Sequence, residues 1–126
     1  MTATILVVDD EPDLEALVLQ KFRRQIRDGT VAFVFAHDGI EALQSIEDHP
    51  HVDMVVSDIN MPRMDGYEVI RHLRGNSAHK STPILVLTTE SEADKKNLAR
   101  VAGATGWMVK PFDPERLIAT INKVAP

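Results

Sequence analysis

The sequence predicts a single α/β domain, a parallel five-stranded sheet covered by helices on both faces. Three observations support this prediction. Five short apolar runs alternate with amphipathic stretches along the 126 residues, and the residues within each run are apolar at successive positions. Strands that are apolar throughout are typical of parallel sheets, because helices bury both of their faces. No two runs are joined by a short hairpin turn, which favours crossover connections.

Three strands and two helices are predicted in the first half of the chain. The first helix has Pro12 in its first turn, and apolar residues follow at helical spacing. The second helix begins with Asp38 and Glu41, three residues apart as in a capping box. The strands are residues 5–8, 31–36 and 54–56, and the apolar helix positions are Leu14, Leu17, Val18, Phe22 and Ile26, then Ile40, Leu43 and Ile46.

Three helices and two strands are predicted in the second half. A helix begins at the capping pair Asp65 and Glu68, and another is predicted over residues 91–102, where the apolar face is weak. Asp113 precedes Pro114 at the start of the last helix. The strands are residues 84–87 and 107–109, and the apolar helix positions are Val69, Ile70 and Leu73, then Leu98, Val101 and Ala102, then Leu117, Ile118, Ile121 and Val124.

Composition narrows the class of protein. The chain is 44% hydrophobic and 26% charged, as globular domains are. It has no cysteine, which excludes disulfides, thiolate metal sites and Cys nucleophiles. The first residues show no basic, apolar leader, so we expect a cytoplasmic protein without a membrane partner. The net charge is −5 and the basic residues are scattered, which argues against direct nucleic-acid binding.

Polar side chains follow four of the predicted strands at their carboxyl ends. Because these ends share one edge of a parallel sheet, the side chains are expected to lie close together. Crowded carboxylates repel one another, and a hard divalent cation such as Mg²⁺ relieves that repulsion. A carboxylate can then attack phosphorus, while an ammonium and a hydroxyl bind phosphoryl oxygens. The residues are Asp9, Asp10 and Glu11, then Asp58 and Asn60, then Thr88, then Lys110.

Each of these residues alone has a structural explanation, as a helix cap, a β-branched strand residue or a surface lysine. Together, and in this order, they resemble the receiver domain of two-component response regulators. The resemblance covers nearly the whole chain and implies one receiver domain over residues 1–126. It also implies a flavodoxin-like (βα)5 fold with strand order 2-1-3-4-5. The motifs are Asp9-Asp10, residues 57–66 around Asp58, Thr88-Thr89 and residues 109–112 around Lys110.

Two parts of the chain resemble different branches of that family. Residues 82–123 are similar to single-domain chemotaxis regulators, and residues 21–43 are similar to receivers joined to signalling outputs such as cyclases. The sequence is therefore compatible with a complete regulator, a trimmed receiver or a mosaic.

The resemblance implies a role for each site residue. Asp58 is the expected phosphoacceptor, receiving its phosphoryl group from a sensor histidine kinase or a phosphotransfer protein. Asp10 and Asp58 are expected to bind Mg²⁺ directly, Asn60 through its backbone carbonyl and Asp9 through water. Thr88 and Lys110 are expected to contact the phosphoryl group.

The resemblance also implies a signalling switch that catalyses only its own phosphorylation and dephosphorylation. Trp107 stands at the aromatic switch position, where Tyr or Phe is usual. The expected output surface comprises residues 91–102, the fifth strand and the last helix, and it binds a downstream effector or an attached output domain. The protein is expected to be a monomer or a weak dimer.

Other functions fit parts of the pattern. A haloacid-dehalogenase-type hydrolase also uses an Asp nucleophile, but it has a second Asp where this chain has Asn60. A flavodoxin-like nucleotide binder has a phosphate loop after the first strand, where this chain is acidic. A receiver that only binds proteins, or that serves as a phosphate sink, is a third alternative. The five histidines are expected at the surface: His37, His49, His51, His72 and His79.

Overall fold

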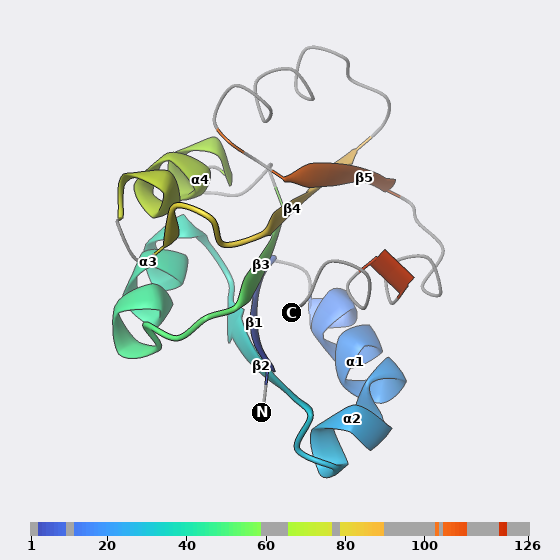
Figure 1. Cartoon of the computed structure of the whole chain (residues 1–126). Coiled ribbons are helices and arrows are strands. Elements are labelled where there is room, and N and C mark those ends of the chain that lie inside the picture. Colours follow the sequence, from blue (N-terminus) through green and yellow to red (C-terminus); the bar gives the residue numbers. More distant parts are fainter. Residues whose placement is uncertain are drawn as a thin grey trace.

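A five-stranded parallel sheet forms the centre of the computed structural model (Figure 1). The structure describes residues 3–9, 12–58, 66–76, 79–89, 103, 105–110 and 119–120. The strand order is β2-β1-β3-β4-β5, and every neighbouring pair is parallel, so the predicted fold class is confirmed. The strands are β1 (Ala3–Val8), β2 (Val31–Ala36), β3 (Met54–Asp58), β4 (Ile84–Thr89) and β5 (Gly106–Lys110).

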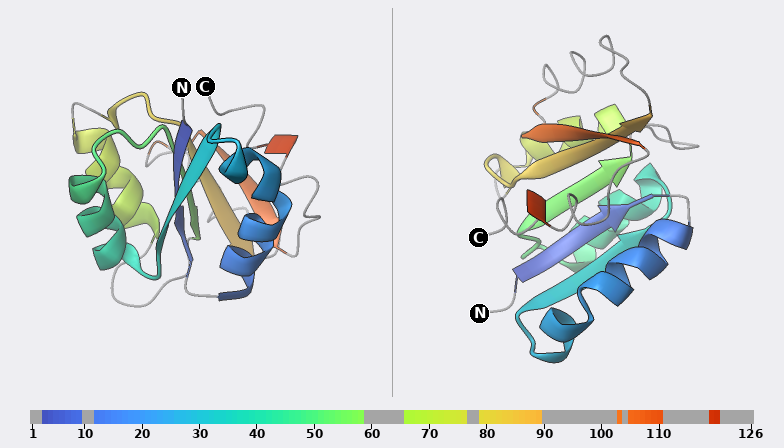
Figure 2. Two further views of the ribbon diagram at one scale, coloured as in Figure 1. Left: turned by 90° about the horizontal axis from the view of Figure 1, so that it is seen from below. Right: turned by 90° about the vertical axis from the view of Figure 1, so that its right-hand side faces the viewer.

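Helices lie on both faces of this sheet. Figure 2 shows α1 and α2 on one face and α3 and α4 on the other. No helix among the described residues is long and apolar enough to cross a membrane. The helices are α1 (Pro12–Lys21), α2 (Arg23–Arg27), α3 (Gly39–Asp48) and α4 (Gly66–Gly75), and residues 119–120 are also helical. The helix predicted over residues 91–102 and the caps predicted at Asp65 and Asp113 lie outside the described residues.

The side chains of β1 divide the hydrophobic core into two clusters. Leu6 and Val8 pack in the cluster beneath α3 and α4, whereas Ile5 and Val7 pack in the cluster beneath α1 and α2. All four are at most 2% exposed. The unbroken apolar run of the first strand therefore has the predicted cause, burial on both faces.

The single helix predicted from residue 12 to residue 26 is wrong in one detail, because Phe22 separates α1 from α2. Its backbone has φ −101° and ψ 15°. The helical hydrogen bonds continue across it, from the Phe22 N–H to the Val18 carbonyl (3.0 Å) and from the Ile26 N–H to the Phe22 carbonyl (2.9 Å). The apolar stripe therefore stays on one face, and Phe22 is 1% exposed.

The predicted cap of α3 is confirmed in part. The Asp38 carboxylate accepts a hydrogen bond from the Glu41 N–H at 2.9 Å. The Glu41 side chain, which would complete a capping box, instead approaches the His37 ring. The cap therefore leaves the Glu41 carboxylate available for a contact outside the helix.

The expectation that all five histidines lie at the surface is wrong for His79, which is 1% exposed. Its Nδ1 lies 3.0 Å from the Thr82 hydroxyl, and its backbone N–H donates to the Asn76 carbonyl at 2.9 Å. Burial of a polar ring is tolerated when the ring has a hydrogen-bonding partner, which here is the Thr82 hydroxyl. The other four histidines are exposed.

Candidate functional site

The strand register brings four predicted site residues to neighbouring strand ends. Val8, which precedes Asp9, pairs with Ser57, which precedes Asp58. Asp58 is the last residue of β3 and pairs with Leu87, the residue before Thr88. Farther along the edge, Thr89 pairs with Lys110, the last residue of β5. All five strands point the same way, so these backbone positions line one edge of the sheet (Figure 2).

Asp9 directly follows β1 and is buried, with 5% exposed surface. Its backbone N–H donates to the Ala36 carbonyl at 3.0 Å, which fixes the chain at the end of the strand. A buried carboxylate is costly unless hydrogen bonds or a cation compensate for the lost water. Oxygen donors of this kind are the ligands that Mg²⁺ prefers. The residue types at this edge therefore fit the predicted cation.

The structure brings together the predicted site residues only in part. Asp58, Thr88 and Lys110 are placed by their backbone positions, and Trp107 lies in β5 opposite Val86. Asp10 and Asn60 lie outside the described residues. Within the described part of the chain, no three His, Cys, Asp or Glu side chains form a group that could hold a metal ion.

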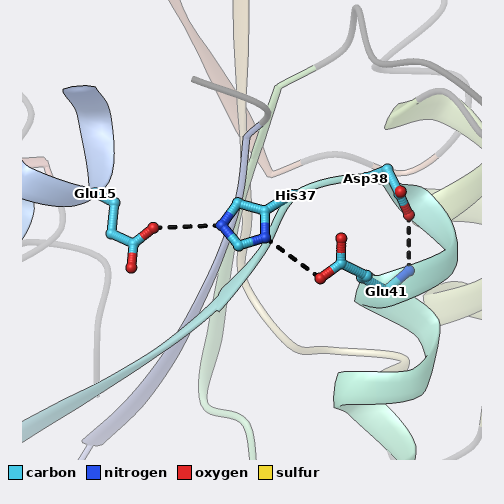
Figure 3. A network of polar contacts seen from close by, with 4 residues as sticks. All are labelled: Glu15, His37, Asp38 and Glu41. Atoms are coloured by element: carbon cyan, nitrogen blue, oxygen red, sulfur yellow. Dashed lines mark hydrogen bonds and ion pairs between the residues drawn. The ribbon is translucent and has the colours of Figure 1, made fainter. Parts of the chain in front are cut away.

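A polar network at the same edge was not anticipated from the sequence. His37, which follows β2, lies between two carboxylates: its Nε2 is 3.4 Å from Glu15 Oε2, and its Nδ1 is 3.3 Å from Glu41 Oε1 (Figure 3). Hydrogen bonding to Glu41 and then to Glu15 raises the pKa of His37. The network joins α1 to α3 around the end of β2. Glu15 and His37 are far apart in sequence, so no local spacing could have indicated the contact.

The fold and the strand-end positions of these residues are those that the resemblance to a receiver domain predicts. The family model for the response regulator receiver domain matches residues 5–122. The chain therefore belongs to this family of two-component signalling proteins. The dehalogenase-type hydrolase and the flavodoxin-like nucleotide binder are set aside by this assignment.

Individual relatives agree with the family. The chain is 41% identical over 123 residues to the response regulator MprA of Mycobacterium tuberculosis H37Rv, covering 97% of this chain and 50% of MprA. The MprA protein of Mycobacterium ulcerans gives the same identity and coverage. The chain thus spans about half the length of the curated relatives it matches.

Solved structures show the same CheY-like fold. The chemotaxis response regulator CheY4 of Vibrio cholerae is 40% identical, with a TM-score of 0.84 and coverage of 98% of this chain and 99% of that protein. The receiver domain of the sensor histidine kinase PA1611 from Pseudomonas aeruginosa is 24% identical, with a TM-score of 0.82 and 98% coverage of both chains, and shares the fold. That structure contains a magnesium ion in its active site cleft.

Proposed function

We propose that this receiver domain accepts a phosphoryl group on Asp58 from a sensor histidine kinase or a phosphotransfer protein. The observation that carries the proposal is the register of β3. Asp58 ends this strand between β1, which leads into Asp9, and β4, which carries Thr88. Membership of the receiver family supports the same assignment.

In the proposed reaction, a carboxylate oxygen of Asp58 attacks the phosphorus of a phosphohistidine. The new oxygen–phosphorus bond forms as the phosphorus–nitrogen bond breaks. The histidine nitrogen keeps the electron pair of that bond and takes up a proton. Hydrolysis of the acyl phosphate returns Asp58 and inorganic phosphate, so the domain is a switch that turns over only its own phosphoryl group.

The proposed cofactor is Mg²⁺. Asp10 and Asp58 would bind it directly, Asn60 through its backbone carbonyl and Asp9 through water. Bound there, the cation would offset the repulsion between carboxylates and phosphoryl oxygens. The burial of Asp9 and the oxygen donors at this edge support the proposal, as does the shared fold with the magnesium-containing PA1611 receiver.

Two further residues of the proposed site lie on β4 and β5. Thr88 near the end of β4 and Lys110 at the end of β5 are proposed to bind phosphoryl oxygens, by a hydroxyl and by an ammonium. Phosphorylation is then proposed to switch the surface formed by residues 91–102, β5 and the last helix, with Trp107 in β5. An effector follows this switch only if it binds the two states with different affinities.

The cellular location, the oligomeric state and the output of the domain are also proposals. We expect the domain to act in the cytoplasm as a monomer or a weak dimer, as one receiver spanning residues 1–126. The surface would control either a separate effector or an attached output domain.

Phosphorylation can be tested with acetyl phosphate and Mg²⁺, followed by intact mass measurement. The wild-type protein should gain one phosphoryl group, and chelation of the cation should prevent the gain. Asp58→Asn should remain unmodified, whereas Asp48→Asn, at an exposed position in α3, should behave like wild type. Labelling of Asp58→Asn at the wild-type rate, or no labelling of wild type, would contradict the proposal.

A further inference from the structure

The side chain of Arg74, in the last turn of α4, binds two segments that are distant in sequence from one another. Its acceptors among the described residues are neutral oxygens, and its guanidinium spans them with all three nitrogens. Nη1 donates to three carbonyls before β4, and Nε and Nη2 donate to the turn before β5. The acceptors are the carbonyls of His79 (2.9 Å), Lys80 (3.2 Å), Thr82 (2.7 Å) and Gly103 (2.9 Å), and the hydroxyl of Thr105 (3.5 Å).

Both of these segments lead directly into strands of the candidate site. Residues 79–82 precede β4, which begins at Ile84, and Thr105 directly precedes β5. Thr105 also joins the two strands at their start. Its hydroxyl accepts the Ile84 N–H at 2.9 Å, and its own N–H donates to the Ile84 carbonyl at 2.9 Å. Arg74 is therefore hydrogen-bonded to the residue that closes the first rung between β4 and β5.

Gly103 is shaped to receive this arginine. Its φ of +110° is a conformation that side chains rarely adopt. A Cβ at this position would lie 2.9 Å from Arg74 Cγ and 3.2 Å from Arg74 Nε. The arginine stem thus packs against the glycine backbone while its Nε binds the glycine carbonyl. A lysine has a single ammonium and cannot donate from three nitrogens in a planar fork.

We propose that Arg74 is a positioning residue for phosphoryl transfer that acts through β4 and β5. It lies where these two strands begin, whereas Asp58 lies where β3 ends. Arg74 fixes where both strands begin, and their far ends carry Thr88 and Lys110. The two strands are short and are paired from Leu85 with Gly106 to Thr89 with Lys110. Because they are held together along this length, we expect a displacement at their start to shift their carboxyl ends as well. This role rests on the proposed function of the site.

The test uses beryllofluoride with Mg²⁺ as a phosphoryl mimic and the fluorescence of Trp107, the one tryptophan of the chain, as the signal. Arg74→Met removes every donor, and Arg74→Lys keeps the charge without the fork. Thr105→Val removes only the hydroxyl between Arg74 and Ile84, which covers the case in which Arg74→Met does not fold. Arg71→Met, an exposed arginine on the same helix, is the matched control. Urea unfolding of each variant is measured in parallel.

We expect Arg74→Met to raise the beryllofluoride midpoint about fivefold or more, with a smaller shift for Arg74→Lys and Thr105→Val and none for Arg71→Met. A purely structural role would lower the urea midpoint and leave the beryllofluoride midpoint unchanged. Titrations of the folded Arg74 and Thr105 variants that match wild type would therefore overturn the positioning role alone. Absence of any response in wild type would overturn the proposed function and, with it, this role.

Discussion

Two histidines have pKa values that their surroundings move in opposite directions. His37 is exposed between the carboxylates of Glu15 and Glu41, and its hydrogen bonds to them raise its pKa above 6.5. His79 is buried, and desolvation lowers its pKa below 6.5. The first residue therefore favours the folded state when protonated, and the second favours it when neutral.

Replacing His37 by Ala should lower the free energy of unfolding more at pH 6 than at pH 9. A group whose pKa is raised by folding stabilises the folded state fully at pH values below 6.5, its pKa in the unfolded chain. This stabilisation is lost as the pH rises through the pKa that His37 has in the folded state. Because the His37 side chain is 52% exposed, the loss should be less than about 1 kcal/mol.

Urea titrations at several pH values measure this loss. Glu41→Gln and Glu15→Gln remove one carboxylate each. Each should also lower the free energy of unfolding more at pH 6 than at pH 9, by less than His37→Ala does. A loss that grows with pH would contradict the assignment.

His79 should make the protein less stable as the solution becomes acidic. Because the pKa of His79 is lowered in the folded state, the unfolded chain binds a proton at this residue before the folded protein does. The folded state therefore keeps its full stability above pH 6.5 and loses stability as the pH falls from 6.5 through the pKa that His79 has in the folded state. His79→Gln should thus be destabilised relative to wild type at pH 7.5, and the difference should narrow toward pH 5. Thermal unfolding across this range provides the measurement. A constant difference would show that only the hydrogen bond to Thr82 was lost.

At the level of helices and turns, two glycines with positive φ differ in their surroundings. Gly29, just after α2, has φ +77°, and a Cβ added to it would meet no atom within 4 Å, whereas a Cβ on Gly103 would meet Arg74 at 2.9 Å. Gly29→Ala should therefore cost only the backbone strain, about 1–2 kcal/mol. Gly103→Ala should cost more, since it also displaces the arginine. Urea unfolding of both variants tests the order, and equal costs would show that Arg74 moves aside freely.

Local signals explain which elements could be predicted. The cap of α3 depends on Asp38 and Glu41, which are only three residues apart, so the spacing of these two residues in the sequence was enough to predict it. The interruption at Phe22 could not be predicted, because the apolar spacing continues through it. The burial of His79 has no periodic signal either. It depends on Thr82 and on the carbonyl contact with Arg74, which arise only when the loop is folded against α4.

In the candidate site too, features that follow from the strand pattern could be predicted, whereas contacts between residues distant in sequence could not. Parallel strands have their carboxyl ends on the same side of a sheet, so recognising the strands was enough to place Asp9 and Asp58 on that side. That their two strands are neighbours, as the structure has them, followed only from the strand order that the resemblance implied. The contact of His37 with Glu15 and that of Arg74 with Gly103 join residues that are distant in sequence. Neither has a spacing rule that a single sequence could reveal.

For the whole molecule, the sheet separates two cores that should respond independently. Ile5 packs in the core on the α1 side and Ile70 in the core on the α4 side, and both are fully buried. Ile5→Val and Ile70→Val should each cost about 1 kcal/mol. Their costs should add in the double variant within about 0.5 kcal/mol.

The matched comparison combines Ile70→Val with Ile46→Val, since these residues share one core. Residues in one core can share neighbours, so this second pair is free to deviate from additivity. Chemical denaturation of all single and double variants measures both sums. A larger deviation for Ile5 with Ile70 than for Ile46 with Ile70 would show that the sheet transmits packing changes between the cores.

The central place of β1 has a consequence for synthesis on the ribosome. Among the strands of this sheet β1 is made first, yet Ala3 pairs with Val31 on one side and Ile5 pairs with Met54 on the other. A growing chain that stops short of Met54 thus leaves one hydrogen-bonding side of β1 without its partner. Until then the uncharged run Ile5–Val8 is available to other chains, as strands of this composition are when unpaired. The run Ile5–Val8, which is buried in the finished domain, is therefore exposed on the growing chain until the residues of β3 have been made.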